Sequence, residues 1–381
     1  MSAPSSAGPL EVSPTCWMVG ARNPTSLLQC NTYIRTFDSG STRLPVCLDP
    51  GSQFDYPVIE SNIRRLLGDM GEVRAFSVNH QDPDVIGNAG YFCAANPRIG
   101  MVVTEEVWRL AQHLQLRPHR VHFANSVRAP RILIGDRHPW QLVPTPFCHF
   151  RGAMAFYDPE IRTLFSGDLL GGFNRLGHVP LLAEEADWAG IAQFHQIYMP
   201  TREALRYAVR QIRELTPRVE VIAPQHGHVI TGDLIPLFLD RLHELLVGFD
   251  LLALEFDADA LRRYQEVLYR LLGRAAATIG PQAVLGRLQD TAPGDGLETR
   301  VRFQGMDVHI ERDGYSVVAQ AFARLALGEP AEFVNELRSE VLAACTDWQT
   351  PIPPIGVGVE ERTPPETVGP DGIRTQAWWL H

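Results

Sequence analysis

The sequence has no long uninterrupted run of hydrophobic residues, and this absence argues against a membrane protein. Its most apolar stretch, residues 234–254, is interrupted by charged residues and a histidine at helical spacing. A membrane-spanning helix needs about 20 predominantly apolar residues. We therefore expect a helix that packs against a core. Residues 1–9 carry neither the basic leader nor the apolar segment of a secretory signal, so we expect a cytoplasmic protein.

Cysteine and positive charge are both scarce. The six cysteines are widely spaced and include no Cys-x-x-Cys pair, so they indicate neither a disulfide framework nor a zinc ribbon, and we interpret most of them as reduced thiols. Forty-four acidic residues against 34 basic residues give a net charge of −10. We therefore expect no binding to nucleic acid or to an anionic membrane, whereas small neutral ligands remain open.

The composition predicts a globular chain with one large domain and a smaller one, since 45% of the 381 residues are hydrophobic and only 20% are charged. Strands come first, then helices and strands alternate, which predicts an α/β protein with a two-sheet sandwich flanked by helices. We expect a flexible N-terminus at 1–13, the main domain at 14–248, a mostly helical accessory module at 249–349 and a Pro-rich tail at 350–381, with Trp378 and Trp379 docking the end of the tail. The predicted helices include 59–67, 102–116, 202–215, 258–272, 283–288, 317–327 and 331–344, and a small hairpin is predicted around Gly305.

Polar side chains follow three of the predicted strands at the points where the strands end. His80 follows residues 75–78, Asp168 follows residues 163–166, and His226 follows residues 219–224. Strands of an α/β sheet that release His or Asp at their carboxyl ends gather these side chains at one rim, where such folds bind ligands. With His149, Asp82 and Asp84, they form a set that can hold two metal ions.

The segment His80-Gln81-Asp82-Pro83-Asp84-Val85-Ile86-Gly87 resembles the metal-binding motif of the metallo-β-lactamase superfamily. The hydrolases of that superfamily carry His-x-His-x-Asp-His, whereas this chain has Asp82 and Val85 at the second and last histidine positions. The flavodiiron proteins also have a carboxylate at the second position, and Leu164-Phe165-Ser166-Gly167-Asp168 and Ala223-Pro224-Gln225-His226-Gly227 are similar to their later motifs. The resemblance covers roughly residues 14 to 248 and implies a metallo-β-lactamase αββα sandwich.

The resemblance also implies a role for each ligand. His80, Asp82 and His149 would bind the first metal, Asp84 and His226 the second, and Asp168 would bridge them, while Val85 cannot ligate. Two imidazoles with a carboxylate are the set of non-haem iron, so we expect two iron ions, with zinc or manganese as alternatives. Asp49 would support the site by hydrogen bonding, and His228 would support a metal ligand or serve as a spare ligand, unless it is a solvated loop histidine. His178 and His195 are expected to be structural, and Tyr91 and Phe92 to be core residues.

Three functions are compatible with these motifs. The first is a diiron protein that binds, senses or reduces dioxygen or nitric oxide. No flavin mononucleotide site is expected, because residues 249–381 contain neither a phosphate loop after a strand nor a Gly-rich dinucleotide turn, so electrons would come from a redox partner protein. The second is a dinuclear hydrolase of an ester, thioester or phosphodiester. The third is a degenerate fold that binds and signals without catalysis. The resemblance further implies a homodimer.

Overall fold

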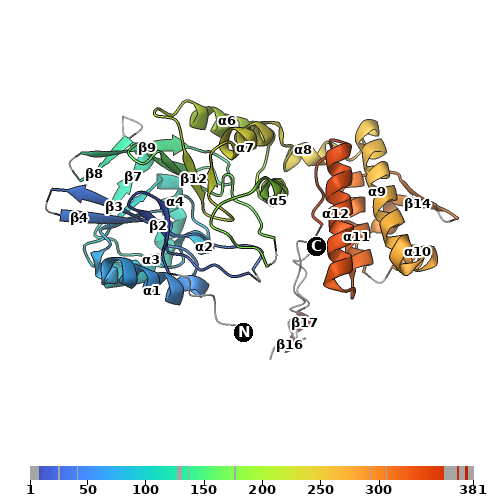
Figure 1. Cartoon of the computed structure of the whole chain (residues 1–381), viewed down its shortest axis with the longest axis horizontal. Coiled ribbons are helices and arrows are strands. Elements are labelled where there is room, and N and C mark those ends of the chain that lie inside the picture. The colour runs from blue at the N-terminus through green and yellow to red at the C-terminus, as the bar shows by residue number, and fades with distance from the viewer. Residues whose placement is uncertain are drawn as a thin grey trace.

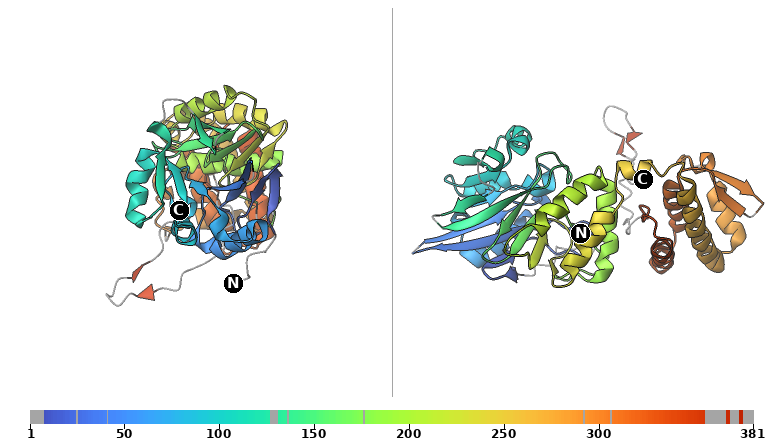
Figure 2. Two further views of the ribbon diagram at one scale, coloured as in Figure 1. Left: turned by 90° about the vertical axis from the view of Figure 1, so that its left-hand side faces the viewer. Right: turned by 90° about the horizontal axis from the view of Figure 1, so that it is seen from above.

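The chain folds into a layered part and a mostly helical part, which lie side by side along the long axis of the molecule (Figures 1 and 2). The structure is a computed structural model that describes residues 8–355, except 25, 41, 127–130, 136, 176, 292 and 306, together with the pairs 367–368 and 374–375. Residues 1–7 of the predicted flexible N-terminus lie outside the described residues. So does the predicted tail beyond 355 apart from those two pairs, including Trp378 and Trp379.

The first sheet of the layered part has seven strands in the order β1 to β7. They are β1 (Leu10–Ser13), β2 (Cys16–Met18), β3 (Tyr33–Ser39), β4 (Thr42–Leu48), β5 (Ala75–Ser77), β6 (Gly100–Val103) and β7 (Arg120–Phe123). The pairs among β1 to β4 are antiparallel, and those from β4 to β7 are parallel, with helical crossovers between them. Residues 10–13, which we assigned to a flexible N-terminus, are instead ordered as β1 because their backbone pairs with β2.

The second sheet has six strands in the order β13-β12-β11-β10-β9-β8. They are β8 (Arg131–Ile134), β9 (His138–Pro144), β10 (Met154–Asp158), β11 (Thr163–Gly167), β12 (Val221–Pro224) and β13 (Ile230–Thr231). Among its strands as the structure describes them, β11 and β12 pair in parallel and the other neighbours are antiparallel. The connection from β11 to β12 contains α5 (Trp188–Tyr198) and α6 (Arg202–Arg213). This arrangement brings the ends of β11 and β12 together at one edge.

In the layered part, three hydrophobic cores lie between four layers: helices, the first sheet, the second sheet and helices. One core packs the first sheet against α1 (Tyr56–Leu67), α3 (Ala89–Ala95) and α4 (Glu105–Ala111). A second packs the other sheet against α5, α6 and α7 (Leu234–Glu244). The third lies between the two sheets and contains the fully buried Trp140. The αββα sandwich predicted from the sequence is therefore confirmed.

The C-terminal part has a hydrophobic core of its own, which includes Leu268, Phe322 and Leu337. Its elements are α8 (Phe249–Leu252), α9 (Ala258–Ile279), α10 (Pro281–Gln289), β14 (Val301–Gln304), β15 (Asp307–Ile310), α11 (Gly314–Ala326) and α12 (Ala331–Asp347), and β16 (Thr367–Val368) pairs with β17 (Arg374–Thr375). The predicted helical extension is present, and β14 and β15 form the predicted hairpin.

The helix predicted over 258–272 continues to Ile279 as α9. Two further predicted helices differ in where they begin or in their continuity. The helix predicted over 102–116 begins only at Glu105, because Val102 and Val103 belong to β6 and the Thr104 side chain caps α4. The helix predicted over 234–254 is broken into α7 and α8 at Gly248, whose φ of 47° is unfavourable for other residues. Within the described part of the chain, none of the helices combines the length and the apolar character that crossing a bilayer requires.

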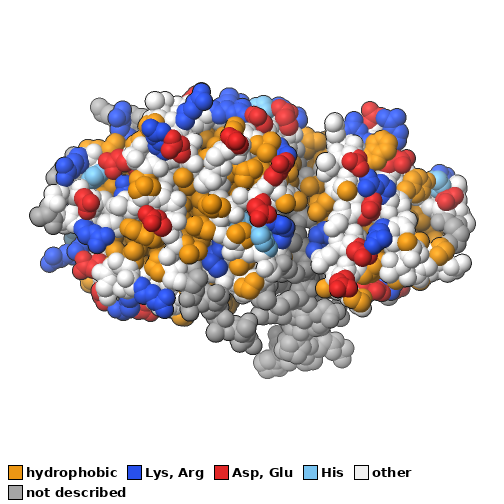
Figure 3. Space-filling view, in the orientation of Figure 1, with side chains coloured by type: hydrophobic (Ala, Val, Ile, Leu, Met, Phe, Trp, Pro, Cys, Tyr) orange, Lys and Arg blue, Asp and Glu red, His pale blue; other side chains and the backbone are white. Residues whose placement is uncertain are grey.

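The surface carries charges of both signs. On the face shown in Figure 3, acidic and basic side chains are interspersed among hydrophobic ones, and neither sign forms one continuous patch. This face therefore offers no extended basic surface of the kind that binds nucleic acid.

Candidate metal centre

The six predicted ligands come from loops that follow strands at one edge of the sandwich. His80 lies just beyond β5, and Asp82 and Asp84 lie at the start of the short helix α2 (Pro83–Ile86). His149 follows β9, Asp168 follows β11, and His226 follows β12. Each strand fixes one end of its loop by backbone pairing, so the loops converge although they are distant in sequence.

The first ligand group consists of His80, His149, Asp82 and one oxygen of Asp168. His149 Nε2 lies 3.2 Å from Asp82 Oδ2 and 3.2 Å from Asp168 Oδ2. His80 Nε2 lies 3.5 Å from the same oxygen of Asp168 and 3.8 Å from Asp82 Oδ2. Ligand atoms that bind one ion at about 2.0–2.2 Å are separated by about 3–4 Å, so these distances suit a single ion.

The second group contains Asp84, His226 and the other oxygen of Asp168. His226 Nε2 lies 3.3 Å from Asp84 Oδ2 and 3.4 Å from Asp168 Oδ1. Asp168 thus directs Oδ2 to the first group and Oδ1 to the second. A carboxylate placed in this way can bridge two cations.

Hydrogen bonds fix the orientation of two of the imidazoles. His226 Nδ1 donates to the carbonyl of Gln29 at 2.7 Å, and His80 Nδ1 donates to Asn79 Oδ1 at 3.1 Å. In both rings this leaves Nε2 directed at the carboxylates. A metal-binding histidine needs this tautomer, because Nε2 must offer a lone pair.

In both ligand groups, carboxylates and imidazoles lie close enough to shift each other's pKa. Burial alone would raise the pKa of Asp168, but the neighbouring imidazoles hold it well below its usual range. Burial lowers the pKa of the His149 imidazole, yet Asp168 and Asp82 outweigh this and raise it to about 10. The pKa of His226 is likewise well above its usual range because of Asp168 and Cys30, despite its burial. The carboxylates therefore attract cations, whether protons on imidazoles or metal ions.

The donor set fits a pair of metal ions. His80, Asp168 and His226 are almost fully buried. Asp168 Oδ1 makes no hydrogen bond of ordinary geometry to any residue that the structure describes. His226 Nε2 is its charged neighbour at 3.4 Å, and a metal ion shared with Asp84 and His226 would satisfy this buried oxygen more directly.

Other predicted residues take different positions. Asp49 Oδ1 accepts a hydrogen bond at 2.8 Å from the backbone N–H of Asn79, so it supports His80 through its neighbour, and burial raises its pKa to about 7. His228 points away from the ligands, because its Nδ1 lies 2.8 Å from the Pro180 carbonyl and its Nε2 3.8 Å from Asp187. His195 is structural, as expected: its Nε2 accepts a hydrogen bond from the N–H of Leu170 at 3.0 Å.

The remaining predicted residues lie outside the ligand groups. His178 pairs with Glu184 at 3.6 Å on a partly exposed surface. Phe92 is a core residue, as predicted, but Tyr91 is 45% exposed and stacks on Tyr56, so its assignment to the core was wrong. Val85 is fully buried in the core between the first sheet and its helices.

One residue that the sequence analysis missed is Cys30. Its side chain forms a group with Asp84 and His226 in which the possible ligand atoms all lie within 4.8 Å of one another. The three residues are far apart in the chain and share no motif, so spacing alone offered no signal. Cys30 precedes β3 and is buried.

Aromatic side chains flank both ligand groups. The ring of Phe194 lies 5.1 Å from that of His226 and 4.7 Å from that of Tyr198, and Tyr198 lies 6.0 Å from His149, measured between ring centres. Tyr198 and Phe147 are each almost half exposed. The surroundings of the ligands are therefore apolar on the side of α5.

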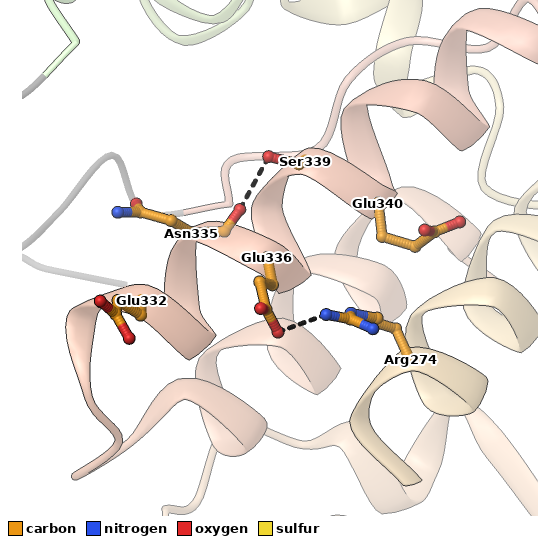
Figure 4. Close-up of a pocket in the computed structure, with 6 residues that line it drawn as sticks. All are labelled: Arg274, Glu332, Asn335, Glu336, Ser339 and Glu340. Carbon is orange, nitrogen blue, oxygen red and sulfur yellow. Dashed lines mark hydrogen bonds and ion pairs between the residues drawn. The ribbon is translucent and has the colours of Figure 1, made fainter. Parts of the chain in front are cut away.

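A separate pocket lies on the helical part, between α9 and α12 (Figure 4). It is lined by Arg274, Glu332, Asn335, Glu336, Ser339 and Glu340 and has a volume of about 560 Å³. Arg274, its one cationic side chain, already pairs with Glu336 at 2.5 Å. The pocket contains none of the predicted ligands.

Comparison with known proteins shows related sequences and folds. The family model described as "ODP family beta lactamase" matches residues 28–227, more than half of the chain. A search of the curated proteins gives no match. Among solved structures, a peroxy diiron species of the chemotaxis sensor ODP shares 22% identity, covering 64% of this chain and 97% of the sensor with a TM-score of 0.51. The apo state of the sensor ODP from T. denticola shares 21% identity, covering 64% of this chain and 96% of the sensor with a TM-score of 0.51. The flavodiiron protein from Giardia intestinalis shares 14% identity, covering 91% of this chain and 91% of that protein with a TM-score of 0.57.

Proposed function

Because the chain belongs to the ODP family of beta lactamases, we propose that it is a non-haem diiron protein that binds or senses dioxygen, or nitric oxide. The observation that carries this proposal is the position of Asp168, whose two oxygens face two separate ligand groups. Oxygen and imidazole ligands with unfilled positions are typical of non-haem iron. Two ferrous ions held there would supply the redox chemistry of oxygen binding, which amino acid side chains lack.

The residues around the ligands favour a small neutral molecule. Phe194 and Tyr198 place aromatic surface beside the two groups, and neither offers a positive charge to an anionic substrate. His80, Asp168 and His226 are buried, whereas the side chains of His149, Asp82 and Asp84 are between about a fifth and a third exposed. A ligand would therefore approach from the side of these three residues.

We also propose that the layered part and the C-terminal part have different roles. Residues 14–248 would hold the metal ions, and residues 249–349 would form an accessory module that contacts a partner or a second copy of the chain. The separate core of the C-terminal part supports this division. If the protein reduces its ligand, electrons would come from an external donor, because we expect no flavin within the chain.

The proposal is tested by metal analysis of protein purified without oxygen. We expect about two irons per chain and a new visible absorption band when oxygen is admitted. Asp168→Asn should lose iron, because an amide cannot bridge two cations through two anionic oxygens. Asp187→Asn is a matched control, since Asp187 is equally buried but bonds to Arg175 and to the N–H of Glu184.

Other results would contradict the proposal in defined ways. Two zinc ions and no spectral response to oxygen would support the dinuclear hydrolase. A protein that folds normally but retains no metal would leave a binding scaffold as the function. Equal loss of iron in both variants would show that the loss reflects damage to the fold.

A further inference from the structure

The second metal position has fewer protein ligands than the first. The first group offers His80, His149, Asp82 and one oxygen of Asp168. At the second position, Asp84, His226 and the other oxygen of Asp168 are the members predicted from the motifs. Val85 cannot add to them, because its side chain is hydrocarbon and is packed in the core.

Cys30 lies where an additional ligand is needed. Its Sγ is 3.9 Å from Asp84 Oδ2. Ligand atoms from Cys30, Asp84 and His226 all lie within 4.8 Å of one another. An ion bound to sulfur at about 2.3 Å and to oxygen or nitrogen at about 2.0–2.2 Å needs separations of about 3–4.4 Å, so only small shifts are required.

The backbone on both sides of Cys30 is tied to the loop that carries His226. Before Cys30, the carbonyl of Gln29 accepts the Nδ1 hydrogen bond of His226 at 2.7 Å. After it, the N–H of Asn31 donates to the carbonyl of Gln225 at 2.6 Å, and its side-chain amide donates to Pro224 and Gly227 at 3.0 and 3.1 Å. The thiol and the imidazole are therefore held in one rigid unit, as a preformed metal site requires.

A second observation points to a cation at this position. Asp168 Oδ1, on a side chain that is 3% exposed, has no hydrogen bond of ordinary geometry among the described residues and faces His226 Nε2. The sulfur of Cys148, which precedes a ligand of the first group, instead lies 3.6 Å from the carbonyl of Ala204 on α6. Among the cysteines, Cys30 is the one that joins a ligand group in the described part of the chain.

We propose that Cys30 is a thiolate ligand of the second metal ion, beside Asp84, His226 and the shared Asp168. On binding, the thiol releases its proton to solvent and its sulfur forms a bond to the metal, with no change of oxidation state. Sulfur is a softer ligand than the oxygen and nitrogen atoms of the first group, so the two positions would differ in metal preference. The proposal deepens the proposed function and depends on it only in requiring an ion at the second position.

The test uses cobalt(II) as a probe of the full-length, metal-free protein. A thiolate bound to cobalt gives a charge-transfer absorption in the near ultraviolet, which imidazole and carboxylate ligands do not give. We expect this band in the wild type and in Cys93→Ser, the control that removes a thiol outside both ligand groups, and no band in Cys30→Ser. Affinity for the second ion should fall at least about tenfold in Cys30→Ser, because loss of a supporting group alone costs that much.

A measurement on the wild type guards against a variant that fails to fold. X-ray absorption of the zinc-loaded protein should show sulfur at about 2.3 Å from the metal. Two bound ions without sulfur scattering and without the cobalt band would overturn the role of Cys30 and leave the dinuclear proposal intact. Failure of the wild type to bind two ions would overturn both proposals.

Discussion

Gly167 has a conformation and a position that together exclude any larger residue. Its φ is +61°, and a Cβ atom built on it would lie 2.0 Å from Asn79 Cγ and 2.1 Å from Asn79 Oδ1. Asn79 is buried, accepts a hydrogen bond from His80 Nδ1 and donates one to the carbonyl of Met154. We therefore predict that Gly167→Ala displaces the Asn79 side chain and releases His80.

The cost of this substitution has two parts. A non-glycine residue at positive φ costs about 1–2 kcal/mol. Displacing Asn79 leaves His80 Nδ1 and the Met154 carbonyl without partners in a buried site, at about 1–3 kcal/mol each. We expect the free energy of unfolding of the layered part to fall by roughly 3–8 kcal/mol, and the affinity for the first metal ion to fall as well.

The measurement is urea unfolding of the metal-free protein, with Gly232→Ala as the matched control. Gly232 has a φ of +60° and nothing within 4 Å of its built Cβ, so this control isolates the backbone cost. Adding Asn79→Ala to Gly167→Ala removes the clash, so Gly167→Ala should cost only about 1–2 kcal/mol in that background. If alanine at 167 cost no more than alanine at 232, our reasoning about Asn79 would be refuted.

Three further predictions concern charge. Because the pKa of His149 is about 10 in the metal-free protein, a proton competes with the metal ion for this imidazole. In metal-binding titrations between pH 6 and pH 9, the affinity for the first ion should therefore rise about tenfold or more per pH unit. An affinity that does not change with pH would contradict this prediction. Burial lowers the pKa of His195 to about 4, so the unfolded chain binds a proton at this residue more readily than the folded chain, and stability falls as the pH drops from 6.5 to 4. In urea unfolding, the free energy by which the wild type exceeds His195→Gln should therefore shrink by about 3 kcal/mol over this range. A difference that stays constant with pH would disprove this prediction. Arg35→Ala leaves the fully buried Asp158 without the guanidinium that lies 2.7 Å from its carboxylate. The free energy of unfolding should fall by about 3–5 kcal/mol while the metal content stays unchanged. A loss of metal with unchanged stability would contradict this and indicate that Arg35 acts on the loops that carry the ligands.

The parts of the site that could be predicted are those encoded by short motifs at strand ends. His80, Asp168 and His226 each follow an apolar strand, so the local sequence indicates both the strand and the edge at which it ends. Cys30 could not be found in this way, because its neighbours Asp84 and His226 are brought to it by the fold alone. Likewise, His228 lies two residues after a ligand, yet its ring turns to Pro180 and Asp187, which the sequence does not reveal.

Prediction of the helices and strands was limited in the same way. The helix α5 was not predicted, because the six consecutive residues Ile191 to Gln196 are all buried, so the helix lacks the alternation of polar and apolar faces that marks a surface helix. The β-branched Val102 and Val103 were assigned to a helix although the buried parallel strand β6 accommodates them. In both cases tertiary burial determined the structure and left no clear periodicity.

The path of residues 350–355 restricts how the two parts of the molecule can move. The chain leaves the layered part at α8, where the N–H of Phe249 donates to the carbonyl of Pro200. It returns to it near Ile355, because the side chain of Gln193 on α5 donates to the carbonyls of Pro353 and Ile355, and Tyr264 on α9 holds Pro351 from the other side. A body attached at one point can swing in any direction, whereas one attached at two points can rotate only about the line that joins them. Cleavage of the peptide chain within α8 would therefore leave the two parts joined by non-covalent contacts alone, among them the hydrogen bonds from Gln193 to the carbonyls of Pro353 and Ile355.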